Sequence, residues 1–213
     1  MVSDADRDAE ATIRDLLAGE RPDDGLLGEE GSQADGASGR RWVVDPLDGT
    51  TNYLYRFPAW VVSIALEDPN GGLVGVVHDP LRNETFTAIR EKGARLNGVA
   101  IVVSGAERLD IALIGTGFGY AAERRAEQAA VVSRLLPRVR DIRRAGAAAL
   151  DLCMVACGRL DGYYERGLNA WDWSAGSLIA SEAGAAVLPL PGEPFGLAVA
   201  SPAIADELAA LVD

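Results

Sequence analysis

Two aspartates raise the first question of chemistry. Asp45 and Asp48 follow the apolar pair Val43-Val44 and are separated by Pro46-Leu47. They could simply form a turn between a strand and a helix, with Asp48 as the cap of that helix. Residues 49–51, Gly-Thr-Thr, suggest more, because small residues with backbone N–H groups at a helix start favour an anion. Carboxylates beside an anion require cations between them, so the alternative is a divalent-metal site.

Two further acids stand in similar settings. Glu29 follows a glycine where the chain is expected to leave a structural element, and Asp172 precedes an otherwise apolar helix. Taken alone, Glu29 would be an ordinary loop acid and Asp172 a helix N-cap. Together with Asp45 and Asp48 they form an oxygen-rich donor set without histidine or cysteine. Such a set favours a hard cation such as Mg²⁺ over zinc.

The other candidates for chemistry are weaker. Cys153 and Cys157 lack partner ligands for a metal because His78 is the only histidine, so we expect two buried core thiols in a reducing cytosol. We expect His78 itself to be an ordinary surface or core residue. Residues 115–119 (GTGFG) resemble a dinucleotide-binding motif, but the third glycine comes one position early. The sequence therefore favours a turn near a pocket.

Composition narrows the class of protein. The chain has 213 residues, 48% of them apolar and 24% charged, which is typical of a globular protein with a substantial core. The net charge of −12 argues against binding to a phosphate backbone. The acidic start differs from a signal peptide, and no apolar run approaches the length of a membrane span. We therefore expect a cytoplasmic protein that binds neither nucleic acid nor membrane.

The elements that must position these acids can be read from the pattern of apolar residues. Residues 4–19 predict a helix ended by Gly19, and residues 31–40 a mobile surface loop rich in glycine and serine. An antiparallel meander is expected next, with strands at 42–44, 60–67, 73–78, 84–90 and 100–103.

The second half of the chain predicts an alternation of strands and helices. Strands are expected at 111–114, 141–143, 160–165, 185–188 and 197–200. Helices are expected at 121–136, 145–157 and 171–183, the last ended by Gly184, with a final helix from about residue 202. A meander followed by alternating elements predicts a layered α/β or α+β fold with two sheets.

Three segments resemble the signature motifs of a known family. They are GEEGS at 28–32, WVVDPLDGTTNY at 42–53 and WDWSAGSLIASEAGA at 171–185. Their types and order are similar to those of the inositol monophosphatase family, whose members are Mg²⁺-dependent, Li⁺-sensitive phosphatases. The intervening segments 75–98 and 163–172 are similar too, so the resemblance covers essentially the whole chain. The first Asp motif alone would also fit fructose bisphosphatases and 3′-phosphoadenosine phosphatases.

The resemblance implies a fold. It is an α+β, layered αβαβα sandwich of the sugar-phosphatase type, with residues 1–213 as a single domain. An N-terminal α+β part would cover about 1–104 and a C-terminal α/β part about 105–213. Family members usually carry a further helix and hairpin upstream of the segment that matches 2–10. We therefore expect the usual first helix to be absent, which would affect stability, dimerisation and metal affinity.

The resemblance also implies the metal ligands. Glu29, Asp45 and the backbone carbonyl of Leu47 would bind a first Mg²⁺. Asp45, Asp48 and Asp172 would bind a second, with Asp45 bridging the two. A third and weaker ion would be held by Glu29 and water.

The same resemblance assigns the remaining site residues. Gly49 and Thr50 would hold the phosphate through backbone N–H groups, and the Thr50 hydroxyl and Glu29 would orient and deprotonate the attacking water. Glu165 would contact a substrate hydroxyl, and Asp6 would act as a second-shell aspartate. Asp48, Asp172 and the turn formed by Gly146, Ala147 and Ala148 would also face the substrate.

These residues predict Mg²⁺-dependent hydrolysis of a small phosphorylated polyol, with inositol-1-phosphate as the first candidate. Histidinol phosphate, or another sugar or nucleotide phosphate, is the alternative within the phosphatases. A non-catalytic binding or regulatory protein on the same fold is the alternative outside them. By analogy with the family we expect a homodimer.

Overall fold

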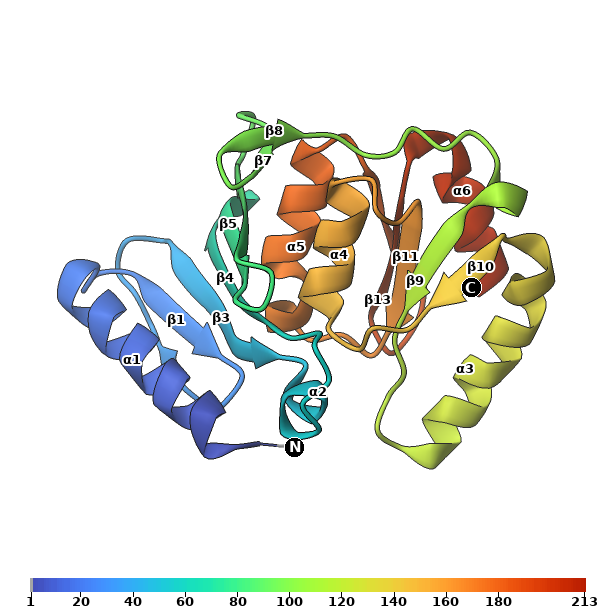
Figure 1. Cartoon of the computed structure of the whole chain (residues 1–213). Helices are drawn as coiled ribbons and strands as arrows, with labels where there is room; N and C mark the ends of the chain where they lie inside the picture. Colours follow the sequence, from blue (N-terminus) through green and yellow to red (C-terminus); the bar gives the residue numbers. More distant parts are fainter. Residues whose placement is uncertain (1) are drawn as a thin grey trace.

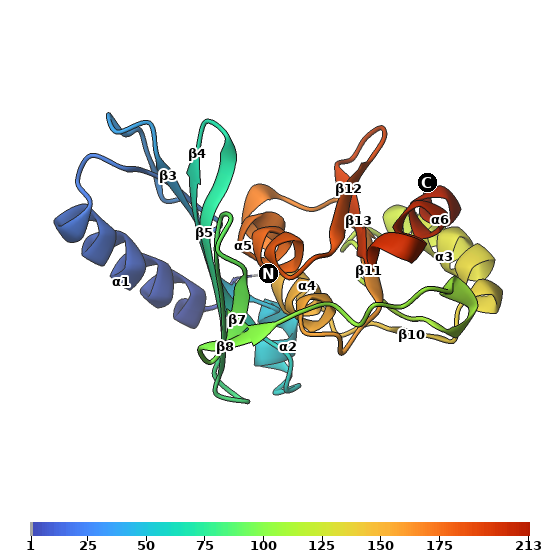
Figure 2. The ribbon, with the colours of Figure 1, turned by 90° about the horizontal axis from the view of Figure 1, so that it is seen from above.

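The computed structural model describes residues 2–213 and consists of five layers. Figure 1 shows them in the order helix α1, first sheet, helices α4 and α5, second sheet, helices α3 and α6. Figure 2, seen from above, separates the same layers. The expected αβαβα arrangement is therefore confirmed.

The first sheet has eight strands in the order β2-β1-β3-β4-β5-β6-β7-β8. From β3 onward it is an antiparallel meander, as the sequence predicts, but with one strand more, because β7 lies between the strands expected at 84–90 and 100–103. The pairing of β1 parallel to β3, and of β2 antiparallel to β1, was not predicted. The strands are Gly25–Gly28, Gln33–Ala34, Arg41–Asp48, Val61–Asp68, Gly71–Asp79, Glu84–Ile89, Ala94–Leu96 and Val99–Ile101 for β1 to β8.

The second sheet has five strands in the order β10-β9-β11-β13-β12. Strand β9 pairs in parallel with β10 and β11, whereas β13 runs antiparallel to β11 and β12. Along the chain, the last strand of the first sheet ends at Ile101 and the first strand of the second sheet begins at Leu113. That the chain is a single domain with two parts that meet near residue 104 stays a prediction. The strands β9 to β13 are Leu113–Thr116, Asp141–Arg143, Gly162–Arg166, Ala186–Leu190 and Gly196–Ala200.

The helices are close to those expected, with differences at their ends. The α-helices α1 to α6 are Asp4–Glu20, Thr50–Leu54, Ala122–Leu135, Ala148–Ala156, Ala170–Glu182 and Pro202–Val212. Two short 3₁₀ turns lie at Leu109–Ile111 and Leu136–Arg138.

Two predicted helix ends were wrong. Gly19 is not the cap of α1, because the helix continues to Glu20 and its C-cap is Arg21. Arg21 precedes Pro22, which disfavours the helical conformation and so ends the helix. Helix α4 begins at Ala148 rather than at residue 145, because Gly146 has a φ of +90°, which lies outside the helical region.

The main core lies between the two sheets, around α4 and α5. Gly75 of β5 and Gly176 of α5 allow this close packing. An added Cβ would lie 2.8 Å from the backbone oxygen of Ala175 in the first case and 2.8 Å from Leu152 in the second. Cys153 is buried in this core as expected, but Cys157 is only partly buried, which corrects the prediction for that thiol.

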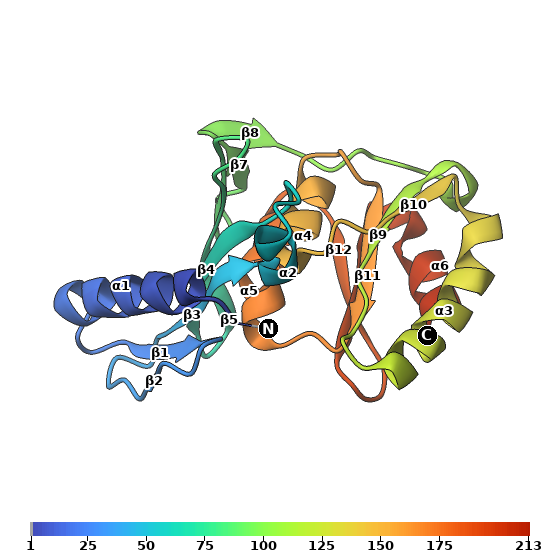
Figure 3. The same ribbon diagram turned by 60° about the horizontal axis from the view of Figure 1, so that its bottom comes forward.

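The outer helix α1 packs differently. It lies alone against the outer face of the first sheet, beside β1 and β3 (Figure 3). Its two buried residues are both acids, Asp6 and Glu10. Across residues 2–213 no helix is long and apolar enough to cross a membrane.

Candidate active site

A bulge at the end of β3 presents the two aspartates. Asp45 pairs with Ser63 of β4 and Asp48 pairs with Val61, so three steps along β3 match two steps along β4. The extra residue bends the strand and changes the direction of the side chains around it. Asp45 fixes the bulge, since its Oδ1 accepts the N–H of Leu47 at 2.9 Å. Both aspartates are buried, with 2% and 8% of their surface exposed.

Gly49 connects the bulge to α2. It is the N-cap of this helix and has the left-handed conformation, with φ of 95° and ψ of 36°. An added Cβ would lie 2.8 Å from the backbone oxygen of Ala59, so conformation and space both require glycine. Because Gly49 is the cap, Asp48 does not have the capping role that a simple turn would give it.

Thr50 begins α2 and is buried. Its hydroxyl is 3.1 Å from Asp6 Oδ1 and 3.1 Å from the carbonyl oxygen of Leu47, and it can donate to one of them at a time. Asp6 also accepts the backbone N–H and the hydroxyl of Ser3. Asp6, which was predicted to be a second-shell residue of the site, thus contacts Thr50 directly.

Helix α4 lies between the two sheets, and its N-terminal end contacts the bulge of β3. Asp48 Oδ2 accepts the N–H of Ala149 at 2.7 Å. The Asn52 side chain donates to the carbonyl oxygens of Ala59 and Ala145, which holds the turn before α4 against α2. Gly146 and Ala148 line the cavity, whereas the Cβ of Ala147 packs near Gly49; the contact of this turn with substrate stays a prediction.

Glu29 reaches the aspartates from the loop after β1. Its backbone N–H donates to the carbonyl oxygen of Val44 at 3.1 Å, and its side chain lies against that of Asp45. Its Oε2 atom is buried and has no hydrogen-bond partner among residues 2–213. A buried carboxylate oxygen without a partner is costly, so this atom calls for a donor or a cation.

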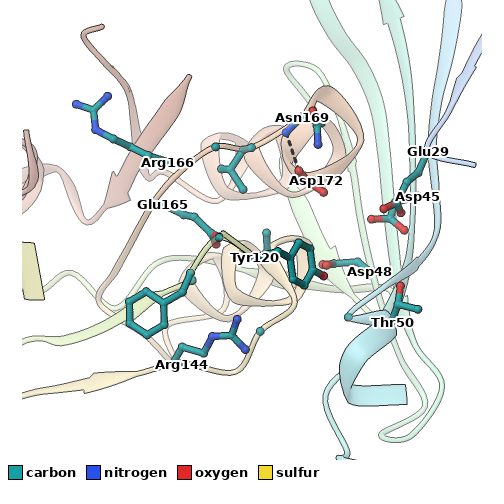
Figure 4. A pocket seen from close by; sticks show the side chains of 18 of the residues that line it. Glu29, Asp45, Asp48, Thr50, Tyr120, Arg144, Glu165, Arg166, Asn169 and Asp172 are labelled. Carbon is teal, nitrogen blue, oxygen red and sulfur yellow. Dashed lines mark hydrogen bonds between the residues drawn. The ribbon is translucent and has the colours of Figure 1, made fainter. Parts of the chain in front are cut away.

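Asp172 enters from the first turn of α5. The helix is capped by Asn169, and Asp172 Oδ2 accepts the backbone N–H of Asn169 at 2.6 Å (Figure 4). The alternative of Asp172 as the N-cap is therefore wrong. Since only one of its carboxylate oxygens is used in this bond, the other remains available to the cavity.

Glu165 lies on β11 beside the glycine-rich segment 115–119. Its Oε2 accepts the hydroxyl of Tyr163, and a side chain at Gly117 would collide with its carboxylate. Gly117, Phe118, Gly119 and Tyr120 all line the cavity. Gly115 and Thr116 belong to β9, which corrects the turn expected over the whole segment, and residues 117–119 form a loop that lines the cavity. The glycine at 117 is explained by the approach of Glu165.

These side chains surround a cavity of about 250 Å³. In Figure 4, Glu29 and Asp45 face each other, Asp48 and Asp172 approach from separate sides, and Glu165 lies across from them. Arg144 and Arg166 also line it. Arg166 is committed to the carbonyl oxygen of Pro191 and to Asp213, so Arg144 is the basic side chain that remains.

Burial is the main cause that raises the pKa values of these carboxylates. Burial, followed by the charges of the neighbouring acids, raises the pKa of Asp45 and Asp48 well above the usual range. Burial also raises the pKa of Glu29 to about 7 and that of Asp172 to about 6. Glu165 reaches about 7, again mainly through burial. The charge of Arg144 lowers the pKa of Glu165 but does not offset its burial.

The donor set fits Mg²⁺. Its atoms are carboxylate and carbonyl oxygens, which this ion prefers, and Glu29 Oε2 is without a partner. Within residues 2–213 no group of three or more His, Cys, Asp or Glu side chains is placed so that it could hold a metal ion by itself. Mg²⁺ does not need one, because it commonly keeps waters and binds through one or two carboxylates together with phosphate oxygens of a substrate.

Two neighbours of the site were missed by the sequence reasoning. Glu10 lies one helical turn after Asp6 and accepts the N–H groups of Glu30 and Ser32, on either side of Gly31. The spacing of four residues on one helix face was a signal that could have found it. Arg144 lies with its guanidinium 5.8 Å from the ring centre of Phe118, and no pattern in the sequence singles it out.

Comparison with known proteins gives consistent matches. The model of the inositol monophosphatase family matches residues 1–212. Inositol-1-monophosphatase SuhB of Mycobacterium tuberculosis is 45% identical over 223 residues, covering 98% of this chain and 77% of that protein. Nus factor SuhB of Escherichia coli K12 is 43% identical over 193 residues, covering 90% of this chain and 72% of that protein.

Solved structures agree with this. Mycobacterium tuberculosis SuhB superimposes with a TM-score of 0.89 at 45% identity, covering 97% of this chain and 82% of that chain. The IMPase of Thermotoga maritima superimposes with a TM-score of 0.90 at 32% identity, covering 99% and 82%.

Proposed function

The chain belongs to the inositol monophosphatase family, and we propose that it hydrolyses the phosphate monoester of a small polyol, with inositol-1-phosphate as the first candidate. One observation supports this proposal most strongly. Glu29, Asp45, Asp48 and Asp172 come from three separate parts of the chain to one cavity, where burial and the charges of neighbouring acids raise the pKa of Asp45 and Asp48. Such an arrangement is unfavourable unless cations bind.

We assign the metal ligands accordingly. Glu29, Asp45 and the Leu47 carbonyl would hold one Mg²⁺, and Asp45, Asp48 and Asp172 a second. When bound, Mg²⁺ lowers the pKa of the attacking water and neutralises charge on the phosphate and the leaving alkoxide. The number of ions, two or three, is part of the proposal.

Thr50 and Glu29 would orient the attacking water. When the Thr50 proton points at Asp6, the lone pairs of its hydroxyl oxygen are free to accept a hydrogen bond from water. Glu29 has an unpartnered oxygen available as the base. Backbone N–H groups of Gly49 and Thr50 would hold the phosphate in line with this water.

The polyol would occupy the other end of the cavity. Glu165 projects there and can accept hydrogen bonds from sugar-like hydroxyl groups, and Gly146 and Ala148 leave room beside it. Asp48 and Asp172 would also face the substrate. Because the Glu165 carboxylate gives this part of the cavity a hydrogen-bond acceptor, a small hydroxylated molecule fits it better than a large apolar one.

The test is release of inorganic phosphate in the presence of Mg²⁺. The panel contains inositol-1-phosphate, histidinol phosphate, sugar phosphates and nucleotides, so that comparison of kcat/KM identifies the substrate. We expect turnover by the wild-type chain and none by Asp45→Asn, because the bridging ligand loses its charge. Absence of turnover on the whole panel, or full activity of the variant, contradicts the proposal.

Relatives named Nus factor SuhB favour a second candidate, a non-catalytic binding role. The phosphatase needs the carboxylates of the cavity to bind Mg²⁺, whereas a non-catalytic binding protein does not. A chain that binds no Mg²⁺ by calorimetry and releases no phosphate would support the second. A cytoplasmic location and a homodimer are further proposals from the family, and light scattering of the purified chain tests the dimer.

A further inference from the structure

Helix α1 contacts the rest of the molecule through acids rather than through a fully buried apolar stripe. Its 17 residues, Asp4–Glu20, contain two that are buried, Asp6 and Glu10, with 0% and 4% of their surface exposed. They are four residues apart and therefore share a helix face. A helix that packs on a sheet normally buries apolar side chains there, so two buried carboxylates require a different explanation.

Each acid has hydrogen-bond partners at the candidate active site. Asp6 meets Thr50, as described above. Glu10 accepts the backbone N–H of Glu30 through Oε2 at 2.8 Å and that of Ser32 through Oε1 at 2.9 Å. Both donors belong to the loop that joins β1 to β2 and carries Glu29. The bonds are charge-assisted, and each such bond is stronger than a neutral one.

The loop is shaped around this carboxylate. The N–H of Gly28 donates to the carbonyl oxygen of Ser32 at 2.7 Å and closes the loop. Gly31 has a φ of +104°, which turns the chain so that the N–H groups on both sides of it point to Glu10. A side chain at Gly28 would occupy the position of the Glu10 carboxyl group, and the three nearest atoms to an added Cβ all belong to Glu10.

These contacts fix the backbone around Glu29. On one side Glu10 holds Glu30, and on the other the N–H of Glu29 donates to Val44, which directly precedes Asp45. The side chain of Glu29 is thereby kept against Asp45, although its own Oε2 makes no hydrogen bond. Few other contacts could do this, because the loop is short and its outer side is exposed.

We propose that Glu10 is a positioning residue for the metal site, which holds the loop of Glu29 so that Glu29 and Asp45 present their oxygens to one Mg²⁺. The inference rests on the proposed function only in taking Glu29 and Asp45 as ligands. It makes α1 part of the metal site although none of its residues lies against the cavity. Replacing a residue that orients a metal ligand commonly lowers the metal affinity by about 10- to 100-fold.

The role differs from simple stabilisation of the fold. Glu10, Glu30, Gly31 and Ser32 also line an open groove on the surface. Water in this groove can replace the carboxylate as a partner of the two N–H groups, so loss of Glu10 frees the loop without leaving buried donors unpaired. The expected effect is therefore on metal affinity more than on the unfolding of the chain.

Two variants test this from opposite sides of the contact. Glu10→Gln removes the charge and presents an amide to the two donors. Gly28→Ala leaves Glu10 intact but displaces its flexible carboxyl group from the loop. Asp8→Asn is the matched control, since Asp8 is an exposed acid of the same helix whose side chain makes no hydrogen bond. Mg²⁺ binding is measured by isothermal titration calorimetry, and thermal unfolding is measured in a chelator.

We expect the Kd for Mg²⁺ to rise by about tenfold or more in Glu10→Gln and Gly28→Ala, and to be unchanged in Asp8→Asn. The double variant should bind Mg²⁺ no more weakly than Glu10→Gln alone, because both changes break the same contact. If both single variants keep the wild-type Kd, or if Kd changes only in proportion to lost thermal stability, the inference is overturned while the proposed function stands. A wild-type chain that binds no Mg²⁺ overturns the metal assignment as well.

Discussion

Asp48 and Ala149 are joined by a hydrogen bond of 2.7 Å across 101 residues of the chain. The carboxylate belongs to the bulged end of β3 in the first sheet, and the N–H group belongs to the first turn of α4, which lies between the sheets. The bond therefore fixes one wall of the cavity against the core of the molecule. It also gives Asp48 a structural task besides its proposed role as a metal ligand.

Two substitutions separate these tasks. Asp48→Ala leaves the N–H of Ala149 without its partner, and we expect the free energy of unfolding to fall by about 1–3 kcal/mol. Asp48→Asn keeps an oxygen acceptor and removes a charge that repels its neighbours, so we expect the metal-free chain to be at least as stable as the wild type. Both variants should bind Mg²⁺ more weakly. Urea unfolding in a chelator measures the difference, and equal destabilisation by both would contradict the assignment of the bond.

Gly117 offers a test of the proposed substrate end of the cavity. In Gly117→Ala the new methyl group displaces the carboxyl group of Glu165, and we expect kcat/KM for a polyol phosphate to fall roughly 10- to 100-fold, the value of one charge-assisted hydrogen bond. The loss should match that of Glu165→Ala, and the double variant should lose no more than either one. Mg²⁺ affinity, measured in parallel by calorimetry, should be unchanged. A loss confined to the metal affinity would place Glu165 elsewhere in the mechanism.

The sequence alone predicted the parts of the site that lie close together in the chain. The strand expected at 42–44, which in the structure extends to Asp48, the turn through Gly49 and the helix after Asn169 are all encoded by neighbouring residues. The layered fold followed from the order of elements and from the family resemblance, and the matches with solved structures confirm it.

What the sequence did not predict depends on long-range contacts. Strand β1 has four residues and pairs in parallel with β3, and so short a segment carries no periodic signal. Glu10 meets the loop of Glu29 some 20 residues later, and the contact of Arg144 with Phe118 joins two loops of the second half. Local propensity has no bearing on such pairs, because tertiary packing alone brings them together.

The stability of the metal-free chain should depend on pH through Glu165. Burial raises its pKa to about 7 in the folded chain, above the ordinary value of 4.5 that applies when the chain is unfolded. Between these values the folded state binds more protons than the unfolded one, so stability falls as pH rises from about 4.5 to 7. Glu165→Gln should make this dependence shallower. Thermal unfolding in a chelator across this range measures it, and an identical slope in the variant would contradict the raised pKa.

Removal of metal should destabilise the wild-type chain and leave Asp45→Asn almost unaffected. A ligand that binds only the folded state adds about 2.7 kcal/mol at a free concentration of one hundred times its Kd. For a chain of this size, each kcal/mol corresponds to about 2–4 °C in the midpoint of thermal unfolding. We therefore expect saturating Mg²⁺ to raise the wild-type midpoint by several degrees over that in chelator. Because Asp45→Asn loses the carboxylate that we propose as a shared metal ligand and some of the repulsion around it, its midpoint in chelator should equal or exceed that of the wild type, and Mg²⁺ should add little. If Mg²⁺ raised both midpoints equally, the ion would be binding at a place other than the carboxylates of this cavity.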